Sequence, residues 1–418
     1  MDNPYRDIDR RINGLAGGDL GFTQLLCSEP RTLDSETIEN YHRRYSVIQE
    51  FFSVTIDLFR ASIAGQASPE IFQLLLNEVP DNLGFDYHAR LPESTYRAPV
   101  YFRTDQCSHG RLVEIQCPGS MWGDHQLLWD HFSPKTSEDS ILRDSLETTF
   151  PESLSRYIDD SPRVLHLLDN ASSPQGVRYF IARTLPKVEY FGYTKGLQSI
   201  ECNFIRSHSF FGLLAENLSK TRISNARETG SPLFDLPPNV IFDQKIPMAL
   251  PFDPLTRDHY SDQVRELFPY TAIVRPEGVV GKSGNLETLE NFANRPLRER
   301  AVYLKYAGCD VSRNWGSRTV SRLSKDGSEK TLRELAMRAN ELKNGIPWII
   351  QDEELWKEPV SFLVRDRPGI QTAEMHAKYS AFYGPFGLLG LMSMHRQANK
   401  VHGQLDTVAN ICVEAELK

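Results

Sequence analysis

Residues 161–194, SPRVLHLLDNASSPQGVRYFIARTLPKVEYFGYT, constrain the fold of this chain more than any other stretch. They read as an apolar strand, a loop, a helix and a second apolar strand. Strands joined through a helix run parallel in one sheet, and strands that are apolar throughout indicate a sheet covered on both faces. The stretch therefore predicts a βαβ unit and a buried, partly parallel sheet.

The flanking segments add helices and strands of other kinds. Residues 34–79 carry apolar residues at helical spacing after an N-cap Asp or Ser. Residues 239–275 predict a short strand that ends beside Lys245, then a helix, then a strand at PYTAIV. Further elements follow toward the C-terminus: a strand, glycine-containing loop and strand at 298–323, a helix at 328–345, a buried strand at 346–355 and several antiparallel strands at 372–416. The predicted class is α/β (α+β), with mixed sheets in two or three lobes.

Composition excludes several classes of function. The chain has 418 residues, 40% hydrophobic and 24% charged, with a net charge of −8 and no clustered basic run, so nucleic acid is not an expected partner. The first residues lack the apolar core of a signal peptide, and GPFGLLGLM is too short to span a bilayer. The six cysteines contain no C-x-x-C pair, which argues against structural zinc and for reduced thiols. We therefore expect a cytoplasmic protein without a membrane partner.

Oxygen ligands gather on a predicted β-hairpin at residues 98–117. Asp105 lies on its first strand, and Glu114 and Gln116 lie two apart on its second, so the last two share one face of the sheet. If Asp105 pairs across from them, the three form an oxygen cluster of the kind that Mg²⁺ prefers. A solvated hairpin with a polar outer face is the alternative that this stretch alone leaves open.

Two strand ends further along have residues suited to a nucleotide. Lys305 ends the apolar strand AVYLK and precedes a loop with Gly308 and Gly316, where the backbone can approach phosphates closely. Gln351 and Asp352 end the strand PWIIQD, where backbone groups suit adenine and a carboxylate suits ribose. A lysine that reaches solvent, and a turn with acidic residues, are the simpler alternatives.

Two other segments contain residues of types found in phosphate-binding or catalytic sites. GVVGKSG at 278–284 fails as a P-loop because Pro276 stands at its first glycine position, so we expect a flexible loop. Arg396 could hold a polyphosphate through its planar guanidinium group, whereas His402 reads as a structural residue in a turn.

Taken in order, these pieces resemble the circularly permuted ATP-grasp enzymes, which include the glutathionylspermidine synthetase-like carboxylate–amine ligases. The family pattern R-x-D, then E-x-N near a proline, is matched by Arg103-Thr-Asp105, Glu114-Ile-Gln116 and Pro118. FDQKIPMALPF, FPYTAIV, the strand of Lys305 and WIIQ follow in the family's order over residues 95–415. Gln116 departs from the family's asparagine, and the loop after Lys305 has fewer glycines than many relatives.

The resemblance implies an ATP-grasp-like fold and an ATP-dependent ligase that forms an amide through an acyl phosphate and releases ADP and phosphate. Its partners would be a small carboxylate and an amine of the amino acid, peptide or polyamine class. A homodimer is compatible with the sequence, and a non-catalytic nucleotide-binding or scaffold protein is the alternative function.

The resemblance also implies domains and residue roles. It divides the chain into a mostly helical segment at 1–95, a hairpin and βαβ region at 96–235, and ATP-binding lobes at 236–418. The cofactors would be ATP and Mg²⁺. The implied roles are metal binding by Asp105, Glu114 and Gln116, catalysis by Arg103 and Arg396, and nucleotide binding by Lys245, Lys305, Gly308, Gly316, Gln351 and Asp352.

Overall fold

The computed structural model describes most of the chain, and the account below concerns those residues alone. They are residues 25–79, 84–107, 110–117, 121–134, 136, 140–158, 161–167, 174–184, 188–192, 202–207, 233–236, 239–242, 244–310, 313, 319–323, 326–364, 367–401 and 406–415. The class is mixed α/β with one large mixed sheet, as the sequence predicts. Within this part of the chain, no helix is long and apolar enough to cross a bilayer.

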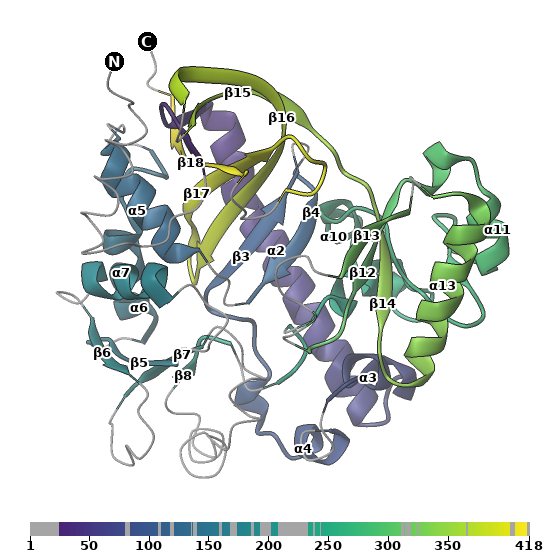
Figure 1. Cartoon of the computed structure of the whole chain (residues 1–418). Coiled ribbons are helices and arrows are strands. Elements are labelled where there is room, and N and C mark those ends of the chain that lie inside the picture. Colours follow the sequence, from purple (N-terminus) through teal and green to yellow (C-terminus); the bar gives the residue numbers. More distant parts are fainter. Residues whose placement is uncertain are drawn as a thin grey trace.

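One eight-stranded sheet forms the centre of the molecule (Figure 1). Its main path runs through β15 (Lys357–Val364), β1 (Leu25–Cys27), β18 (Val408–Glu414), β17 (Gly387–Arg396), β16 (Arg367–Gly384), β3 (Phe102–Gln106) and β4 (Leu112–Gln116). β2 (Arg31–Leu33) pairs with β18, and β15 also pairs with the first half of β16. These pairings close five of the strands into a ring, and the hairpin β3–β4 extends from it on the second half of β16.

Helix α2 (Ser35–Ile63) packs on one face of this sheet. Its start is fixed by Asp34, whose side chain accepts a hydrogen bond from the Thr37 N–H at 2.7 Å, a typical N-cap. Its buried aromatic residues pack against the sheet, and Phe52 meets Phe102 edge-to-face. Past Ile63 the chain turns through Gly65 at φ +72° and begins α3 (Pro69–Leu75). The helical segment predicted at 34–79 is thus two helices.

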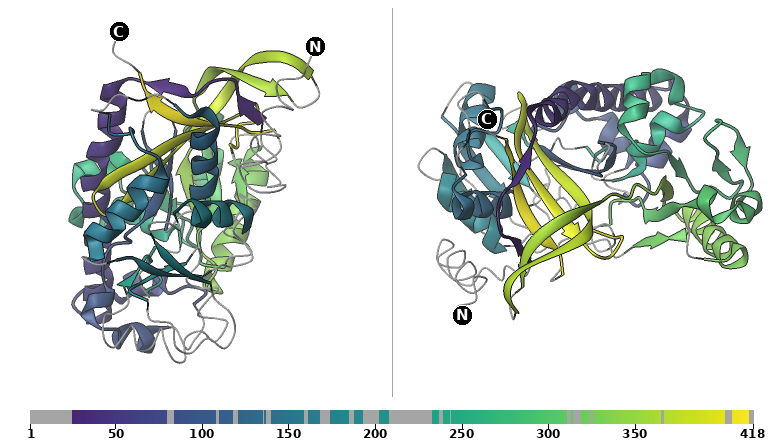
Figure 2. Two further views of the ribbon diagram at one scale, coloured as in Figure 1. Left: turned by 90° about the vertical axis from the view of Figure 1, so that its left-hand side faces the viewer. Right: turned by 90° about the horizontal axis from the view of Figure 1, so that it is seen from above.

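Helices α5 (Trp122–Phe132), α6 (Leu146–Ile158) and α7 (Pro174–Thr184) pack on the other face (Figure 2, right). A small parallel sheet packs with these helices and consists of β6 (Glu189–Gly192), β5 (Arg163–Leu167), β7 (Phe204–Ser207) and β8 (Leu233–Phe234). β5 and β6 pair in parallel and are joined through α7, which confirms the predicted βαβ unit. Buried Arg206 from β7 lies among four aromatic rings of this layer: Tyr101, Trp122, Phe150 and Phe180.

A second antiparallel sheet lies beside β4. Its order is β13 (Val320–Arg322), β12 (Val302–Tyr306), β14 (Trp348–Asp352) and β9 (Thr271–Ile273). The sequence predicts these strands, although not the order in which they pair. Helices α11 (Leu289–Asn294) and α13 (Ser328–Lys343) belong to the same lobe (Figure 1). The buried residues of one face of the sheet form a separate apolar core with Leu335 and Ala339 of α13. The opposite face of this sheet contributes side chains to the site described below.

The segment before Lys245 differs from its prediction. Residues 239–242 form bends and turns instead of a strand, and the predicted helix is a 3₁₀ helix, η4 (Ile246–Phe252), followed by the shorter helices η5 (Arg257–His259) and α10 (Asp262–Leu267). Pro251 lies inside η4 and disfavours a regular α-helix there, because proline lacks the N–H that an α-helix needs. GVVGKSG is also more regular than the expected flexible loop. Its first half contains β10 (Val279–Val280), which pairs with β11 (Leu286–Glu287) just after the segment.

The remaining described helices connect these layers. α4 (Phe85–Ala89) and η2 (Glu93–Thr95) lead into β3, and η6 (Leu297–Arg300) leads into β12. The large sheet takes strands from all three segments at 1–95, 96–235 and 236–418. The predicted division into three domains therefore stays a prediction, and its boundaries do not coincide with those of the large sheet.

Candidate active site

The predicted hairpin forms as β3 and β4, and its register brings the polar residues together. Asp105 pairs directly with Glu114, and Arg103 pairs directly with Gln116. Directly opposed residues of an antiparallel pair point to the same face, so the four side chains share one face of the hairpin. The structure therefore places Asp105 across from Glu114, as the oxygen-cluster prediction requires.

Asp105 is buried and fully occupied by donors from its own sheet. Its Oδ1 accepts hydrogen bonds from Arg103 Nε at 3.0 Å and from Ser380 Oγ at 2.8 Å. Its Oδ2 accepts from Arg103 at 3.1 Å and from Lys378 Nζ at 2.7 Å. Burial alone would raise the pKa of this carboxyl, but the charges of Arg103 and Lys378 hold the pKa well below its usual range. Asp105 is therefore ionised near neutral pH and pairs with two cations.

Lys378 and Ser380 are site residues that sequence reasoning missed. Both lie on β16, where Ser380 pairs with Asp105 in register. The available signal was the alternation in HAKYSAFYG, which puts one lysine and one serine on the same face of an otherwise apolar strand. Only the pairing of β16 with β3, more than 270 positions away, shows which partner they serve.

Glu114 connects the hairpin to the second lobe. Lys245, immediately before η4, places its Nζ 3.2 Å from Glu114 Oε1, and the two side chains are 10% and 26% exposed. Burial would raise the pKa of Glu114, but Lys245 and the more distant Lys378 and Lys305 together hold the pKa below its ordinary value, against the charge of Asp105. Glu114 is therefore also ionised, with fewer donors in contact than Asp105.

Lys305 and Gln351 face the hairpin from neighbouring strands of the second sheet. Lys305 Nζ donates hydrogen bonds to Gln351 Oε1 at 2.5 Å and to the Val113 carbonyl of β4 at 3.2 Å. Gln351 Nε2 in turn donates to Thr271 Oγ1 on β9 at 3.2 Å. The three side chains lie on one face because the antiparallel register of β12, β14 and β9 aligns them. Lys245 and Lys305 thus converge on β4 from the same lobe.

Cationic side chains gather at this junction. Among the described contacts, Arg103, Lys245, Lys305 and Lys378 lie here together with the carboxylates of Asp105 and Glu114. A third carboxylate is Asp124 at the start of α5; burial raises its pKa, and the charge of Arg103 opposes that rise.

Burial lowers the pKa of Lys305 to about 8; the charge of Glu114 opposes this shift and that of Lys245 adds to it. Clustered cations favour a bound anion.

Gly308 follows the Lys305 strand in a tight place. A Cβ there would lie 2.2 Å from Glu78 Oε2 and 2.4 Å from the Tyr306 hydroxyl, so a larger residue would displace the Glu78–Tyr306 contact. Gly316 and Pro118 lie outside the described residues. The predicted role of the two glycines in nucleotide binding stays a prediction.

Asp352 does not share the face of Lys305 and Gln351. It pairs in register with Val302 of the apolar face, and its carboxylate is 2.5 Å from Lys282 Nζ of the β10–β11 hairpin. Consecutive residues of a strand point to opposite faces, so a ligand beside Lys305 does not reach this side chain. The predicted role of Asp352 in nucleotide binding stays a prediction.

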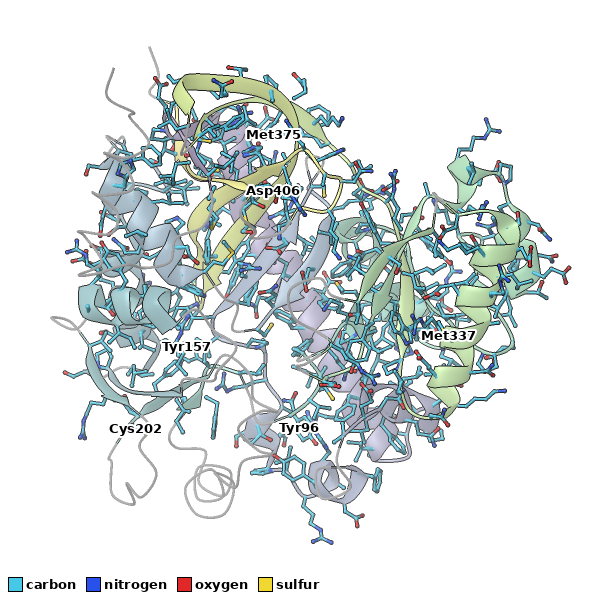
Figure 3. The ribbon with its side chains drawn as sticks, viewed as in Figure 1. Tyr96, Tyr157, Cys202, Met337, Met375 and Asp406 are labelled. Atoms are coloured by element: carbon cyan, nitrogen blue, oxygen red, sulfur yellow. The ribbon has the colours of Figure 1, made fainter. Side chains whose placement is uncertain are left out.

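Arg396 ends β17 and pairs in register with His376, which puts its side chain on the face of Lys378. Its Nε lies 2.8 Å from Asp406, and one guanidinium N–H donates to the Lys400 carbonyl at 2.9 Å. Figure 3 labels Asp406 at this corner of the large sheet and Met337 on α13 at the far side. A direct catalytic role for Arg396 stays a prediction.

Comparisons with known proteins support the fold. No protein-family profile and no curated protein sequence matches the chain. Among solved structures it is similar to a glutathione synthetase-like effector from Globodera pallida in its apo form, with a TM-score of 0.55 and 11% identity over 99% of this chain and 98% of that one. It is also aligned with a protein from Methylobacillus flagellatus, provisionally described as a gamma-glutamylcysteine synthetase. That match has a TM-score of 0.37 and 10% identity over 72% and 76% of the two chains, too low for any inference. The chain thus has a fold similar to that of glutathione synthetase-like proteins.

Proposed function

We propose that the protein is an ATP-dependent carboxylate–amine ligase of the ATP-grasp type. In this reaction a substrate carboxylate oxygen attacks the γ-phosphorus of ATP and ADP leaves. An amine then attacks the acyl carbon, and phosphate leaves as the amide bond forms. The observation that carries the proposal is the cation-rich junction, where Lys245 and Lys305 of one lobe meet the Asp105–Glu114 hairpin of the other. The order of motifs along the chain and the glutathione synthetase-like fold support it.

The residues present fit Mg²⁺ bound together with a nucleotide. Among the described side chains, no group of three His, Cys, Asp or Glu could hold a metal ion by itself. Mg²⁺ in nucleotide sites is typically held by one or two carboxylates plus phosphate oxygens, and does not need such a group. Glu114 and Gln116 would hold it, while Asp105, with both oxygens already accepting hydrogen bonds, keeps Arg103 and Lys378 in place. The bound ion would neutralise charge on the transferring phosphoryl group.

The chain's own side chains supply the rest of the chemistry. Lys245 and Lys305 would bind phosphate oxygens, because both place their ammonium groups beside β4 at the junction. Gln351 orients Lys305 through its hydrogen bond, and Asp105 fixes the guanidinium plane of Arg103 through two contacts. Such prearranged charges stabilise a transferring phosphate without reorganisation during the reaction.

Identification of the spent nucleotide tests the proposal. Purified protein is incubated with Mg²⁺–ATP and mixtures of amino acids, small peptides and polyamines, and the nucleotides are separated by chromatography. We expect ADP and phosphate whose release depends on both substrates. AMP and pyrophosphate would overturn the acyl-phosphate route. Tight nucleotide binding without turnover over the whole mixture would instead support the alternative, a non-catalytic nucleotide-binding protein.

A further inference from the structure

Glu78 reaches the end of the Lys305 strand from a different part of the chain. It lies in the turn after α3, with an uncommon left-handed backbone at φ +59°. Its Oε2 accepts a hydrogen bond from the hydroxyl of Tyr306, the residue next to Lys305. The Tyr306 hydroxyl also accepts a hydrogen bond from the Asp310 N–H at 2.9 Å. Glu78 and Tyr306 therefore tie the end of β12 to the chain that follows it.

Other contacts hold the same few residues. The Cys309 thiol lies 3.7 Å from the Asn77 carbonyl, and Arg313 lies 3.6 Å from Glu78 Oε1. Gly308 passes so close to the Glu78 carboxylate that a Cβ there would displace it. The chain leaving Lys305 is thus bound on several sides by one turn of the N-terminal helical segment.

The Glu78 carboxyl is poised to change charge near neutrality. Burial raises its pKa to about 7, Arg313 opposes this rise, and Asp310 and Glu341 add to it. These groups and Tyr306 are the titratable and charged partners that the described contacts give it. Its ionised form draws Arg313 and accepts the Tyr306 hydroxyl more strongly than the neutral form.

We propose that Glu78 is a positioning residue for nucleotide binding, which fixes Lys305 and residues 308–310 through the Tyr306 hydroxyl. The inference rests on the proposed function, since it takes Lys305 as a phosphate ligand. Glu78 itself touches Tyr306 and Arg313 and acts through them. A contact that served packing alone would affect folding without a specific effect on nucleotide affinity.

The test is calorimetric titration of the full chain with a non-hydrolysable ATP analogue and Mg²⁺. We expect Glu78→Ala and Tyr306→Phe each to weaken binding about fivefold, the net value of one ordinary hydrogen bond, because the link acts on the nucleotide indirectly. The double variant should bind no more weakly than either single variant, because both changes remove the same link. Glu70→Gln is the matched control: it neutralises a half-exposed carboxylate on α3 that lies 3.6 Å from Arg275.

The pH profile separates positioning from packing. Glu78→Gln keeps an oxygen that can accept from Tyr306 but can never ionise. The ratio of wild-type to Glu78→Gln affinity should rise from near one at pH 6 to about threefold at pH 8, as Glu78 ionises near pH 7. Protonation of the nucleotide cancels in this ratio. A ratio that stays constant with pH, or additive losses in the double variant, would overturn the proposal.

Hydrogen exchange in the nucleotide-free protein distinguishes failure of the inference from failure of the proposed function. Faster exchange of the Asp310 amide in Glu78→Ala and Tyr306→Phe, with unchanged exchange in Glu70→Gln, supports the anchoring role. Absence of analogue binding by the wild type overturns the proposed function and the nucleotide role of Glu78 together. Wild-type affinity in Glu78→Ala overturns the inference alone.

Discussion

The two halves of the site solve the problem of buried charge in opposite ways. On the hairpin side, Asp105 accepts four hydrogen bonds, and two cations compensate its charge within its own sheet. On the other side, Lys305 has one amide and one carbonyl as acceptors, and its pKa is lowered to about 8.

A buried carboxylate that is fully paired is part of the scaffold, because removing it leaves cations without a counter-charge. Lys305 is partly buried, and its described hydrogen bonds go to neutral oxygens, so its ammonium group is suited to an anion that arrives from solution. The comparison therefore assigns structural support to Asp105 and ligand recognition to Lys305, and the predictions below test that division.

The largest effect is expected on stability when Asp105 is neutralised. Asp105→Asn should lower the free energy of unfolding by about 3–5 kcal/mol, since it leaves Arg103 and Lys378 buried without their counter-charge. Chemical denaturation measures this. Asp406→Asn, which neutralises the exposed partner of Arg396, should cost under about 1 kcal/mol. Equal losses in the two variants would break the assignment of Asp105 as scaffold.

Glu114 should matter for chemistry more than for folding. Glu114→Ala is expected to reduce Mg²⁺-dependent ADP release about 100-fold or more, because a metal ligand is lost without a large apolar contact. Its melting temperature should stay near that of the wild type. Glu354→Gln is the control, because it removes a charge paired with half-exposed Arg111 outside the cluster. Full turnover by Glu114→Ala would remove Glu114 from the proposed metal site.

Lys305 should show the reverse of Asp105. Lys305→Met is expected to weaken binding of an ATP analogue about 30-fold, the value of a charged hydrogen bond, while stability stays the same or rises. Lys282→Met is the matched control, because Lys282 pairs with Asp352 on the other face of β14. If the Lys282 variant lost as much affinity, the choice of nucleotide face would be wrong.

A smaller effect is expected from pH on the same lysine. A bound phosphate favours the charged form of Lys305 and so raises its pKa above the value of about 8 in the free protein. Affinity for the analogue should therefore be steady below pH 8 and fall several-fold by pH 9, as the free protein loses that proton. Titrations of wild type and Lys305→Met at matched pH measure this. A decline of the same size in both would assign it to another group.

The sequence predicts local structure in this protein better than long-range contacts. The hairpin of Asp105 and Glu114 and the strand of Lys305 are confirmed, because alternation and turn residues lie within a few positions of one another. Lys378 and Ser380 were missed, because they reach Asp105 only through strand pairing across most of the chain.

Two other differences are local. Residues 239–242 form no strand, and Pro251 inside η4 disfavours a regular α-helix after Lys245. Asp352 was grouped with Gln351 because the two are adjacent, although the alternation of a strand separates them. The glutathione synthetase-like fold that the motifs implied is supported by the structural comparison, while the roles of individual residues stay predictions.

The pairing of Asp105 with Ser380 across 275 positions affects how the protein is made. A chain leaving the ribosome presents the hairpin long before β16 exists, so Asp105 lacks Lys378 and Ser380, and β3 has one unpaired edge during that interval. Closing so long a loop is slow, and unpaired strand edges invite association with other chains. Completion of the large sheet therefore waits for nearly the last residues, and a truncated chain lacking β16 would expose an unsatisfied edge at the centre of the site.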